Sequence, residues 1–114
     1  MRTISIEALG AWLESSQPPR FVDVLSADHF ASGHLPRAEN IPRDQLAIRA
    51  PDEIGRGEPV VVYCSDRECP ESSRAAAILE DLGYREVFHF EGGIAEWRQR
   101  GLPVVRPPRE PRQG

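Results

Sequence analysis

The sequence has few cysteines and no long hydrophobic segment. Its 114 residues include two cysteines, too few for a disulfide scaffold. No apolar run approaches the ~20 residues that a transmembrane helix needs. The N-terminal stretch MRTISIEALGAWLE has no apolar signal-peptide core. A net charge of -4 gives no basic surface for nucleic acid or an anionic membrane. We therefore expect a cytoplasmic protein with free thiols that binds neither nucleic acid nor membrane.

A chain of this length forms one compact domain with a modest core. The final stretch PVVRPPREPRQG changes character, because its prolines and charges do not build a packed element. We predict one domain over residues 1–104 and a flexible tail rich in proline and arginine over residues 105–114.

Apolar residues alternate between strand-like and helix-like patterns along the domain. Short strands are predicted at 21–25, 60–63 and 87–90, and the run VVVY is typical of a strand buried on both faces. Helical spacing occurs after Ser5, at 44–50, at 75–82 before Gly83, and from 94 to 101. Residues 28–42 are rich in turn formers. The alternation predicts an α/β fold with a parallel sheet and helices on both faces.

Cys64 directly follows VVVY and precedes a loop and a predicted helix. In open α/β sheets, ligands bind outside the carboxyl ends of the strands, where the next helix presents unpaired backbone N–H groups. A thiol there is expected to shift toward thiolate, from a pKa of ~8.5 to below about 7.5. From this segment alone, a nucleophile and a buried structural cysteine are equally good interpretations.

Metal binding is not predicted. The C-x4-C spacing of the two cysteines is not a usual zinc pattern. His29, His34 and His89 are not paired at short spacing either.

Several separated segments together resemble the single-domain rhodanese family. FVDVL with DHFASGHLPRAENIP is similar to the family's Asp-containing strand and its G-H-I-P-G-A-x-N-I-P segment. VVVYC and SSRAAAILEDLGYREV are similar to the strand and helix that flank the active-site loop, and FEGGIAEWRQRGLPV to the closing G-G-x-x-x-W-x-x-x-G-x-P segment. The resemblance covers residues 3–104 and implies a rhodanese-like domain with a central parallel sheet of about five strands and helices on both faces.

This resemblance also implies an activity. A loop cysteine would take a sulfane sulfur from a donor, such as thiosulfate or a persulfide-bearing protein. It would then pass the sulfur to a thiol or to cyanide. No cofactor is expected, because the cysteine persulfide itself carries the sulfur.

The usual family loop reads C-x-x-G-x-R, and two registers of this chain compete for it. The loop after Cys64, CSDRECPE, has no glycine and places Glu71 where arginine is expected. Cys69 restores a C-x4-R spacing with Arg74 but lies five residues beyond the strand end. We assign Cys64 as the catalytic residue, because a nucleophile directly after the strand faces the crevice.

Cys69 and Pro70 are expected to be the cap and the first position of the following helix. Two roles for Cys69 stay open. It attacks a persulfide or an oxidised Cys64 as a resolving thiol if the two Cα atoms lie within ~7 Å, or it only fills the start of the helix.

The expected substrate-binding loop and helix start comprise Ser65, Asp66, Arg67, Glu68, Cys69, Ser72, Ser73 and Arg74. Acidic residues outnumber arginines there, which disfavours a dianion such as thiosulfate. Arg67 is the residue best placed to bind a donor anion. A persulfide on a partner protein is therefore the better expected donor.

Two further residues near the site are expected to serve the structure. Asp23 lies inside an apolar strand, where a carboxylate is costly unless it is hydrogen-bonded, so we expect it to anchor a turn. His34 in GHLP is interpreted as a turn histidine.

Two other functions stay open. A redox-sensing or partner-binding rhodanese module would use the same loop without transferring sulfur. A phosphatase or arsenate reductase on this scaffold normally needs an arginine six positions after the cysteine, and that position holds Pro70.

Overall fold

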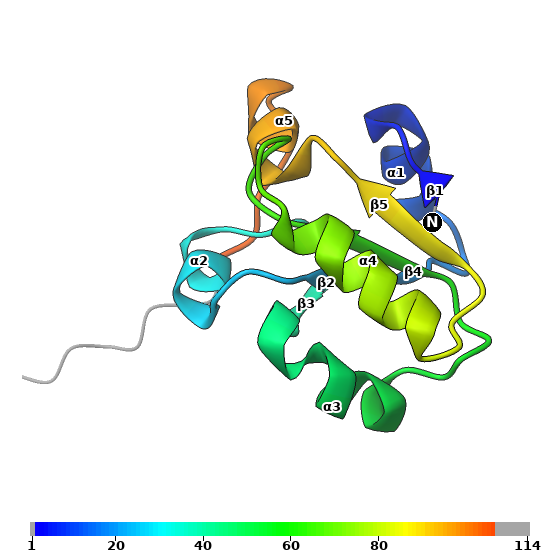
Figure 1. The fold of residues 1–114 in the computed structure, drawn as a ribbon. Helices are drawn as coiled ribbons and strands as arrows, with labels where there is room; N and C mark the ends of the chain where they lie inside the picture. The colour runs from blue at the N-terminus through cyan, green and yellow to red at the C-terminus, as the bar shows by residue number, and fades with distance from the viewer. Residues whose placement is uncertain (1, 107–114) are drawn as a thin grey trace, which may run out of the picture.

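The computed structural model describes residues 2–106. Five parallel strands form one sheet in the order β1-β5-β4-β2-β3 (Figure 1). The strands are β1 (Arg2–Thr3), β2 (Arg20–Asp23), β3 (Ala38–Asn40), β4 (Val60–Tyr63) and β5 (Val87–Phe90). The helices are α1 (Ile6–Leu13), α2 (Ala27–Ser32), α3 (Arg43–Glu53), α4 (Glu71–Asp81) and α5 (Gly93–Gln99). The predicted α/β fold with a five-stranded parallel sheet is confirmed.

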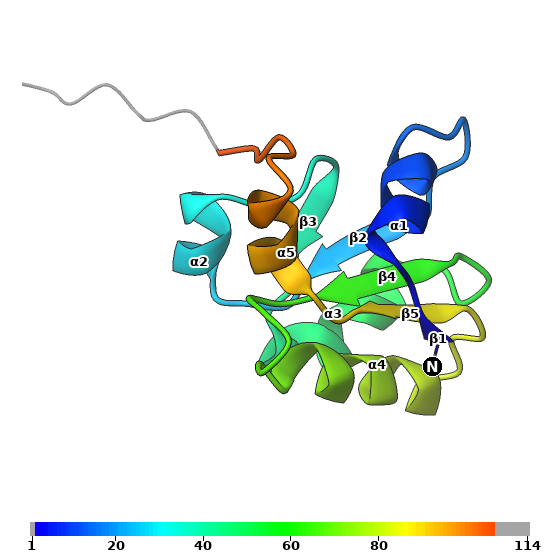
Figure 2. The same cartoon turned by 90° about the horizontal axis from the view of Figure 1, so that it is seen from above.

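Helices cover both faces of the sheet, with α3 and α4 on one side and α1 and α5 on the other (Figure 2). Successive side chains of a strand point to opposite faces. In β4, Val60 and Val62 face α3 and α4, whereas Val61 and Tyr63 face α1 and α5. Both faces of this central strand are buried, as its uninterrupted apolar run predicted.

Local sequence signals set the helix ends. The Ser5 hydroxyl accepts a hydrogen bond from the Ala8 backbone N–H at 3.1 Å and caps α1. Ala75 and Leu79 belong to the buried stripe of α4. Gly83 follows α4 with a φ of 98°, a left-handed conformation that glycine adopts at low cost.

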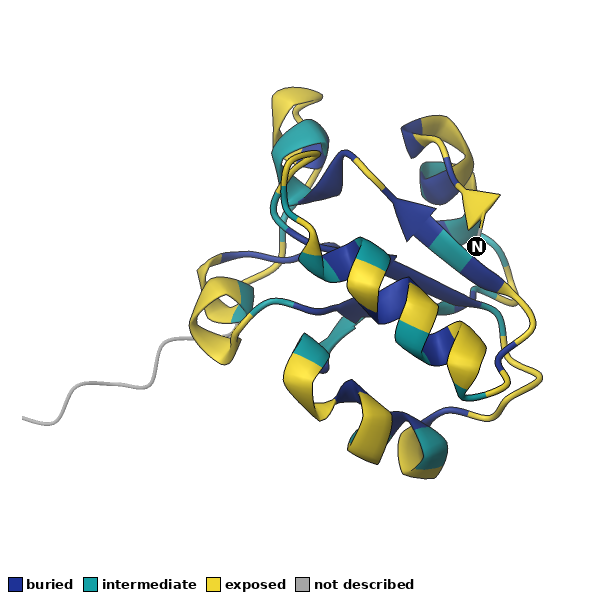
Figure 3. Ribbon diagram, in the orientation of Figure 1, coloured by how far each residue is buried: buried dark blue, intermediate teal, exposed yellow. Residues whose placement is uncertain are grey.

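The prediction that residues 28–42 are rich in turns was incomplete, because this segment contains part of α2 and all of β3. The helix α2 buries no residue, as Figure 3 shows, so it has no apolar stripe to reveal it. The edge strands β1 and β3 are two and three residues long and carry little apolar sequence. The helix α4 begins at Glu71 with Pro70 as its N-cap, one residue later than predicted.

Residues 107–114, which make up most of the predicted tail, lie outside the described residues. Before them, Val105 pairs with His34 through two backbone hydrogen bonds of 2.9 and 2.8 Å. None of the described helices is both long enough and apolar enough to cross a membrane.

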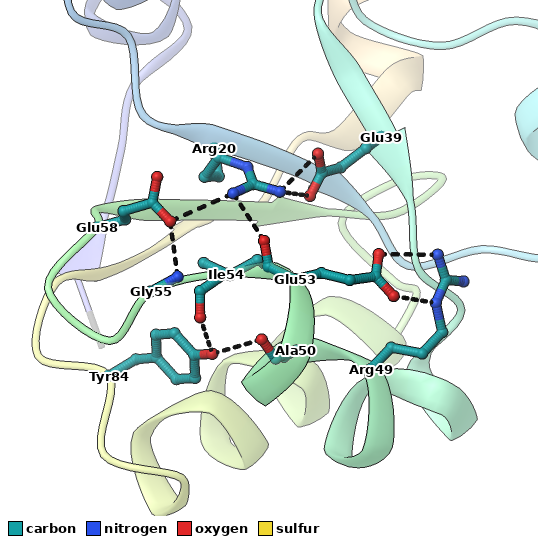
Figure 4. A network of polar contacts seen from close by, with 9 residues as sticks. All are labelled: Arg20, Glu39, Arg49, Ala50, Glu53, Ile54, Gly55, Glu58 and Tyr84. Atoms are coloured by element: carbon teal, nitrogen blue, oxygen red, sulfur yellow. Dashed lines mark hydrogen bonds and ion pairs between the residues drawn. The ribbon is translucent and has the colours of Figure 1, made fainter.

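A polar network connects β2 to the end of α3 and to the segment after it (Figure 4). It lies at the amino-terminal end of β2, away from the carboxyl ends of the strands. Arg20, the first residue of β2, binds the Glu39 carboxylate at 2.7 Å and the Glu53 carbonyl oxygen at 3.0 Å. The Tyr84 hydroxyl lies 2.8 Å from the Ala50 carbonyl oxygen and 2.6 Å from that of Ile54. Tyr84 is buried, so its hydroxyl donates to carbonyl oxygens that water does not readily reach.

Tyr84→Phe is expected to lower the free energy of unfolding by about 1–2 kcal/mol, because two carbonyl oxygens lose their shared donor. For a domain of this size, each kcal/mol corresponds to roughly 4–8 °C in the melting temperature. Thermal unfolding followed by circular dichroism measures this change. Ile48→Ala is the control, since Ile48 is 77% exposed on α3; equal melting temperatures for the two variants would contradict the prediction.

Candidate active site

The sulfur of Cys64 lies at the carboxyl end of β4, beneath the loop that leads to α4. Cys64 is only 1% exposed. Its Sγ lies 3.3 Å from the Ser72 Oγ and 3.4 Å from the Cys69 carbonyl oxygen. The loop therefore folds over the thiol and brings the start of α4 against it.

The N-terminus of α5 holds the beginning of this loop, and Figure 1 shows the loop running beside α5. The backbone N–H groups of Ile94 and Ala95 donate to the carbonyl oxygens of Cys64 and Ser65 at 3.0 and 2.9 Å. Gly93 has a φ of 62° and packs against the loop backbone. A Cβ at this glycine would lie 2.8 Å from the Ser65 carbonyl carbon, too close for a real contact. Gly93 therefore allows α5 to approach and fix the cysteine loop.

Asp66 shapes the loop from within. Its Oδ1 accepts hydrogen bonds from the backbone N–H groups of Glu68 at 3.0 Å and Cys69 at 3.1 Å. Such a turn is a common use of an Asp side chain. It folds the chain back, so that Cys69 reaches Cys64 across five residues.

The two cysteines are in contact, since the Cys64 Sγ lies 3.4 Å from the Cys69 carbonyl oxygen, and their pKa values shift in opposite directions. Burial raises the pKa of Cys64 to about 11, and the hydrogen bond to the Cys69 side chain also raises it. The hydroxyl and backbone amide of Ser72 act in the opposite direction but do not offset these effects. In this closed arrangement the expectation of a thiolate at Cys64 is wrong, because the desolvation of the sulfur exceeds the effect of the helix start.

Cys69 is the more acidic thiol. Burial works to raise the pKa of Cys69, but hydrogen bonds from the Cys64 side chain, the Glu71 backbone N–H and Ser65 outweigh it. The pKa of Cys69 therefore lies below its ordinary value. Cys69 is also partly exposed, unlike Cys64.

Ser72 links Cys64 to a histidine that the sequence did not reveal as part of the site. Ser72 is 1% exposed, and its Oγ lies 2.6 Å from the Nε2 of His89. His89 belongs to β5 and is 8% exposed. One signal was present: Ser72 continues the helical stripe of Ala75 and Leu79 toward the loop, and His89 holds an inward position of β5.

The remaining predicted loop residues point away from Cys64 or serve the local backbone. Arg67 is 67% exposed and pairs with Glu91 and Glu96 at 3.3 and 3.2 Å. Arg74 pairs with Glu71, which also pairs with Arg43. The side chain of Glu68 is exposed. Ser73 donates to the Pro70 carbonyl oxygen within its own helix start. The inward orientation required for Arg67 to bind a donor is therefore absent in this conformation.

Asp23 is the last residue of β2, and His34 follows α2 and forms the β-bridge with Val105. The Asp23 carboxylate accepts a hydrogen bond from the Leu25 backbone N–H at 2.9 Å and so anchors the turn after β2. Burial raises the pKa of Asp23, although the hydrogen bonds from Leu25 and Tyr63 oppose this. The His34 ring stacks on Phe30, with ring centroids 3.7 Å apart, and its Nδ1 bonds the Phe30 carbonyl oxygen at 3.0 Å.

The fold and this site together define a small parallel α/β domain that holds a cysteine at the carboxyl end of its central strand. The model of the rhodanese-like domain family matches residues 5–100. The chain therefore belongs to the rhodanese-like domain family.

Similar proteins differ in how much of their length this chain spans. A sulfurtransferase of Allochromatium vinosum is 35% identical over 104 residues, which are 91% of this chain and 94% of that protein. An HTH-type transcriptional regulator of Mycobacterium tuberculosis is 40% identical over 83 residues, 73% of this chain but 36% of the regulator. The structure of a thiosulfate sulfurtransferase from Pseudomonas aeruginosa superposes with a TM-score of 0.83 at 28% identity, covering 93% of this chain and 20% of that one.

Proposed function

We propose that this protein is a rhodanese-type sulfurtransferase that carries a sulfane sulfur as a persulfide on Cys64. The observation that carries the proposal is the position of the Cys64 sulfur, directly after β4 and against the hydroxyl of Ser72 at the start of α4. The sulfurtransferase named among the similar proteins supports it over nearly the full length of the chain. The reducing cytoplasm expected for this protein would keep both thiols free.

The reaction needs no cofactor. The Cys64 thiolate bonds to the outer sulfur of the donor while the donor's S–S bond breaks. Its electron pair leaves with sulfite from thiosulfate, or with the thiolate of a persulfide donor. A thiol or cyanide acceptor then takes the outer sulfur and regenerates the Cys64 thiolate. Because Cys64 is buried, the loop 65–70 must move before a donor reaches it.

The charges around the loop favour a persulfide on a partner protein over thiosulfate. The Arg67 guanidinium is already paired with Glu91 and Glu96, and the side chains of Asp66 and Glu68 are exposed beside it. A small dianion would meet repulsion here. A protein persulfide brings one reactive sulfur without a second negative group.

Peptide-resolved mass spectrometry of the reduced protein after brief exposure to a sulfur donor tests the proposal. Thiosulfate and glutathione persulfide are used in parallel on wild type, Cys64→Ser and Cys69→Ser. We expect one added sulfur on Cys64 in wild type and in Cys69→Ser, with a larger yield from the persulfide. Added sulfur on Cys69 alone, or on neither cysteine with either donor, would overturn the proposal.

A redox-sensing module is the second candidate, and the contact of the Cys64 Sγ with Cys69 favours it. An oxidant such as hydrogen peroxide would take two electrons and two protons from the pair and leave a Cys64–Cys69 disulfide and water. The HTH-type transcriptional regulator among the similar proteins is compatible with such a role. Rapid disulfide formation under mild peroxide, together with no sulfur uptake from either donor, would establish this function instead.

A further inference from the structure

Three side chains from three elements form a continuous polar path into the core. The Cys64 sulfur at the end of β4 lies 3.3 Å from the Ser72 Oγ of α4. The Ser72 Oγ lies 2.6 Å from the Nε2 of His89 on β5. Both distances are within hydrogen-bonding range, so one proton can shift along the path without passing through solvent.

This path interrupts a layer that is otherwise apolar. On the face of the sheet that meets α4, β4 presents Val60 and Val62, and β5 presents Val87 before His89. Burying a serine and a histidine there is unfavourable unless each finds a partner. Their partners are each other and the cysteine, so the pair is arranged around the Cys64 sulfur rather than around the core.

We propose that Ser72 and His89 form a proton path that accepts the Cys64 proton when Cys64 attacks the sulfur donor. This inference rests on the proposed sulfurtransferase function. Ser72 contacts the reacting sulfur, and His89 acts through Ser72 as a positioning residue and proton acceptor. The structure thereby assigns a base to a cysteine that its own burial keeps protonated.

The step balances without an external base. The Cys64 S–H proton passes to the Ser72 oxygen as the Ser72 O–H proton passes to His89 Nε2. The Cys64 sulfur then bonds to the outer sulfur of the donor, and the donor's S–S electron pair departs with its leaving group. His89 ends as an imidazolium, and its Nε2–H donates back to Ser72, whose hydroxyl faces the new persulfide. Discharge of the persulfide to an acceptor returns the proton.

The surroundings of His89 favour the neutral form of its ring, which is the form that can accept a proton. Burial lowers the pKa of His89, so the ring is neutral at rest, while the Glu91 carboxylate opposes this shift. His89 is registered beside Val62 of β4 and Thr3 of β1, and it faces Ser72 on α4. Among the described residues, Glu91 is thus the charged group that acts on the ring. As the pH falls through the lowered pKa, His89 becomes protonated and can no longer accept.

His89→Gln tests the proposal, because glutamine can still accept the Ser72 hydroxyl hydrogen but cannot become a cation. The measurement uses a Cys69→Ser background, so that the rate of alkylation by iodoacetamide reports Cys64 alone. We expect the rate of sulfur uptake and the rate of Cys64 alkylation each to fall about a hundredfold. The acid limb of both rate profiles should also disappear. Ser72→Ala should give the same fall in both rates.

His29→Gln is the matched control, since His29 is an exposed histidine on α2. It should leave both rates and their pH profiles unchanged. Unaltered alkylation rates and pH profiles in both His89→Gln and Ser72→Ala would overturn the proton path, even if both variants were less stable. The alkylation does not depend on sulfur transfer. A wild type without sulfur uptake therefore overturns the proposed function alone, and the alkylation rates still decide the proton path.

Discussion

Gly93→Ala is expected to destabilise the domain by about 2–4 kcal/mol and to abolish sulfur loading of Cys64. The residue has a φ of 62°, where a side chain strains the backbone. Its new Cβ would also lie 2.8 Å from the Ser65 carbonyl carbon and 2.9 Å from the Asp66 nitrogen. These are backbone atoms, so either α5 or the cysteine loop must move. Moving either one breaks the hydrogen bonds that Ile94 and Ala95 donate to the loop.

Thermal unfolding and mass spectrometry of persulfide loading measure the two parts of this prediction. A loss of this size lowers the melting temperature of a small domain by roughly 10–25 °C. Gly10→Ala is the control, because a Cβ at Gly10 on α1 meets nothing within 4 Å. Alanine within that helix should raise stability by up to ~1 kcal/mol. Similar stability and loading in the two variants would show that Gly93 does not set the loop.

Iodoacetamide is expected to alkylate Cys69 at least about tenfold faster than Cys64 at about pH 8. The pKa of Cys64 is about 11, whereas that of Cys69 lies below its ordinary value, so Cys69 holds far more thiolate. The lower intrinsic nucleophilicity of the more acidic thiol offsets only about half of this advantage on a logarithmic scale. The partial exposure of Cys69 adds to the difference, because the reagent reaches it without loop movement.

The preference of iodoacetamide for Cys69 over Cys64 should decrease as the pH rises. Cys64 gains thiolate as the pH approaches its pKa of about 11, so the ratio of the two initial rates should shrink at alkaline pH. Peptide-resolved quantification at short times gives both rates. Cys69→Ser is the control: it removes the thiol that helps to raise the pKa of Cys64, and it should make Cys64 more reactive than in wild type. Faster labelling of Cys64 than of Cys69 at about pH 8 would contradict the closed loop.

The acidity of the two thiols also bears on how the site works. A buried carrier cysteine with a high pKa is protected from oxidants, since the thiolate is the reactive form. Movement of the loop 65–70 would expose Cys64 and separate it from Cys69. Both changes lower the cost of the Cys64 thiolate, because burial and the Cys69 contact are the two causes that raise its pKa. Loop movement and proton transfer to His89 would therefore act together in the proposed reaction.

Much of the fold could be predicted because the signals were local. The run at 60–63 and the pattern at 87–90 match β4 and β5 residue for residue. The apolar stripe before Gly83 predicted α4, and only its first turn differed. The edge strand β3 and the helix α2 escaped prediction because neither carries a buried apolar pattern. Their positions depend on contacts with the rest of the domain.

The sequence by itself determined the family, the parallel sheet and the position of Cys64 at a strand end, because each follows from short local segments and their order along the chain. Only the tertiary structure decided the chemistry of that cysteine. Burial raises the pKa of Cys64, which the sequence predicted to be lowered, and the turn made by Asp66 brings Cys69 against it. The contact of Ser72 with His89 joins residues 17 positions apart, on a helix and a strand that meet only in the folded domain. Hydrogen bonding and desolvation depend on such three-dimensional neighbours, and a pattern of adjacent residues does not contain them.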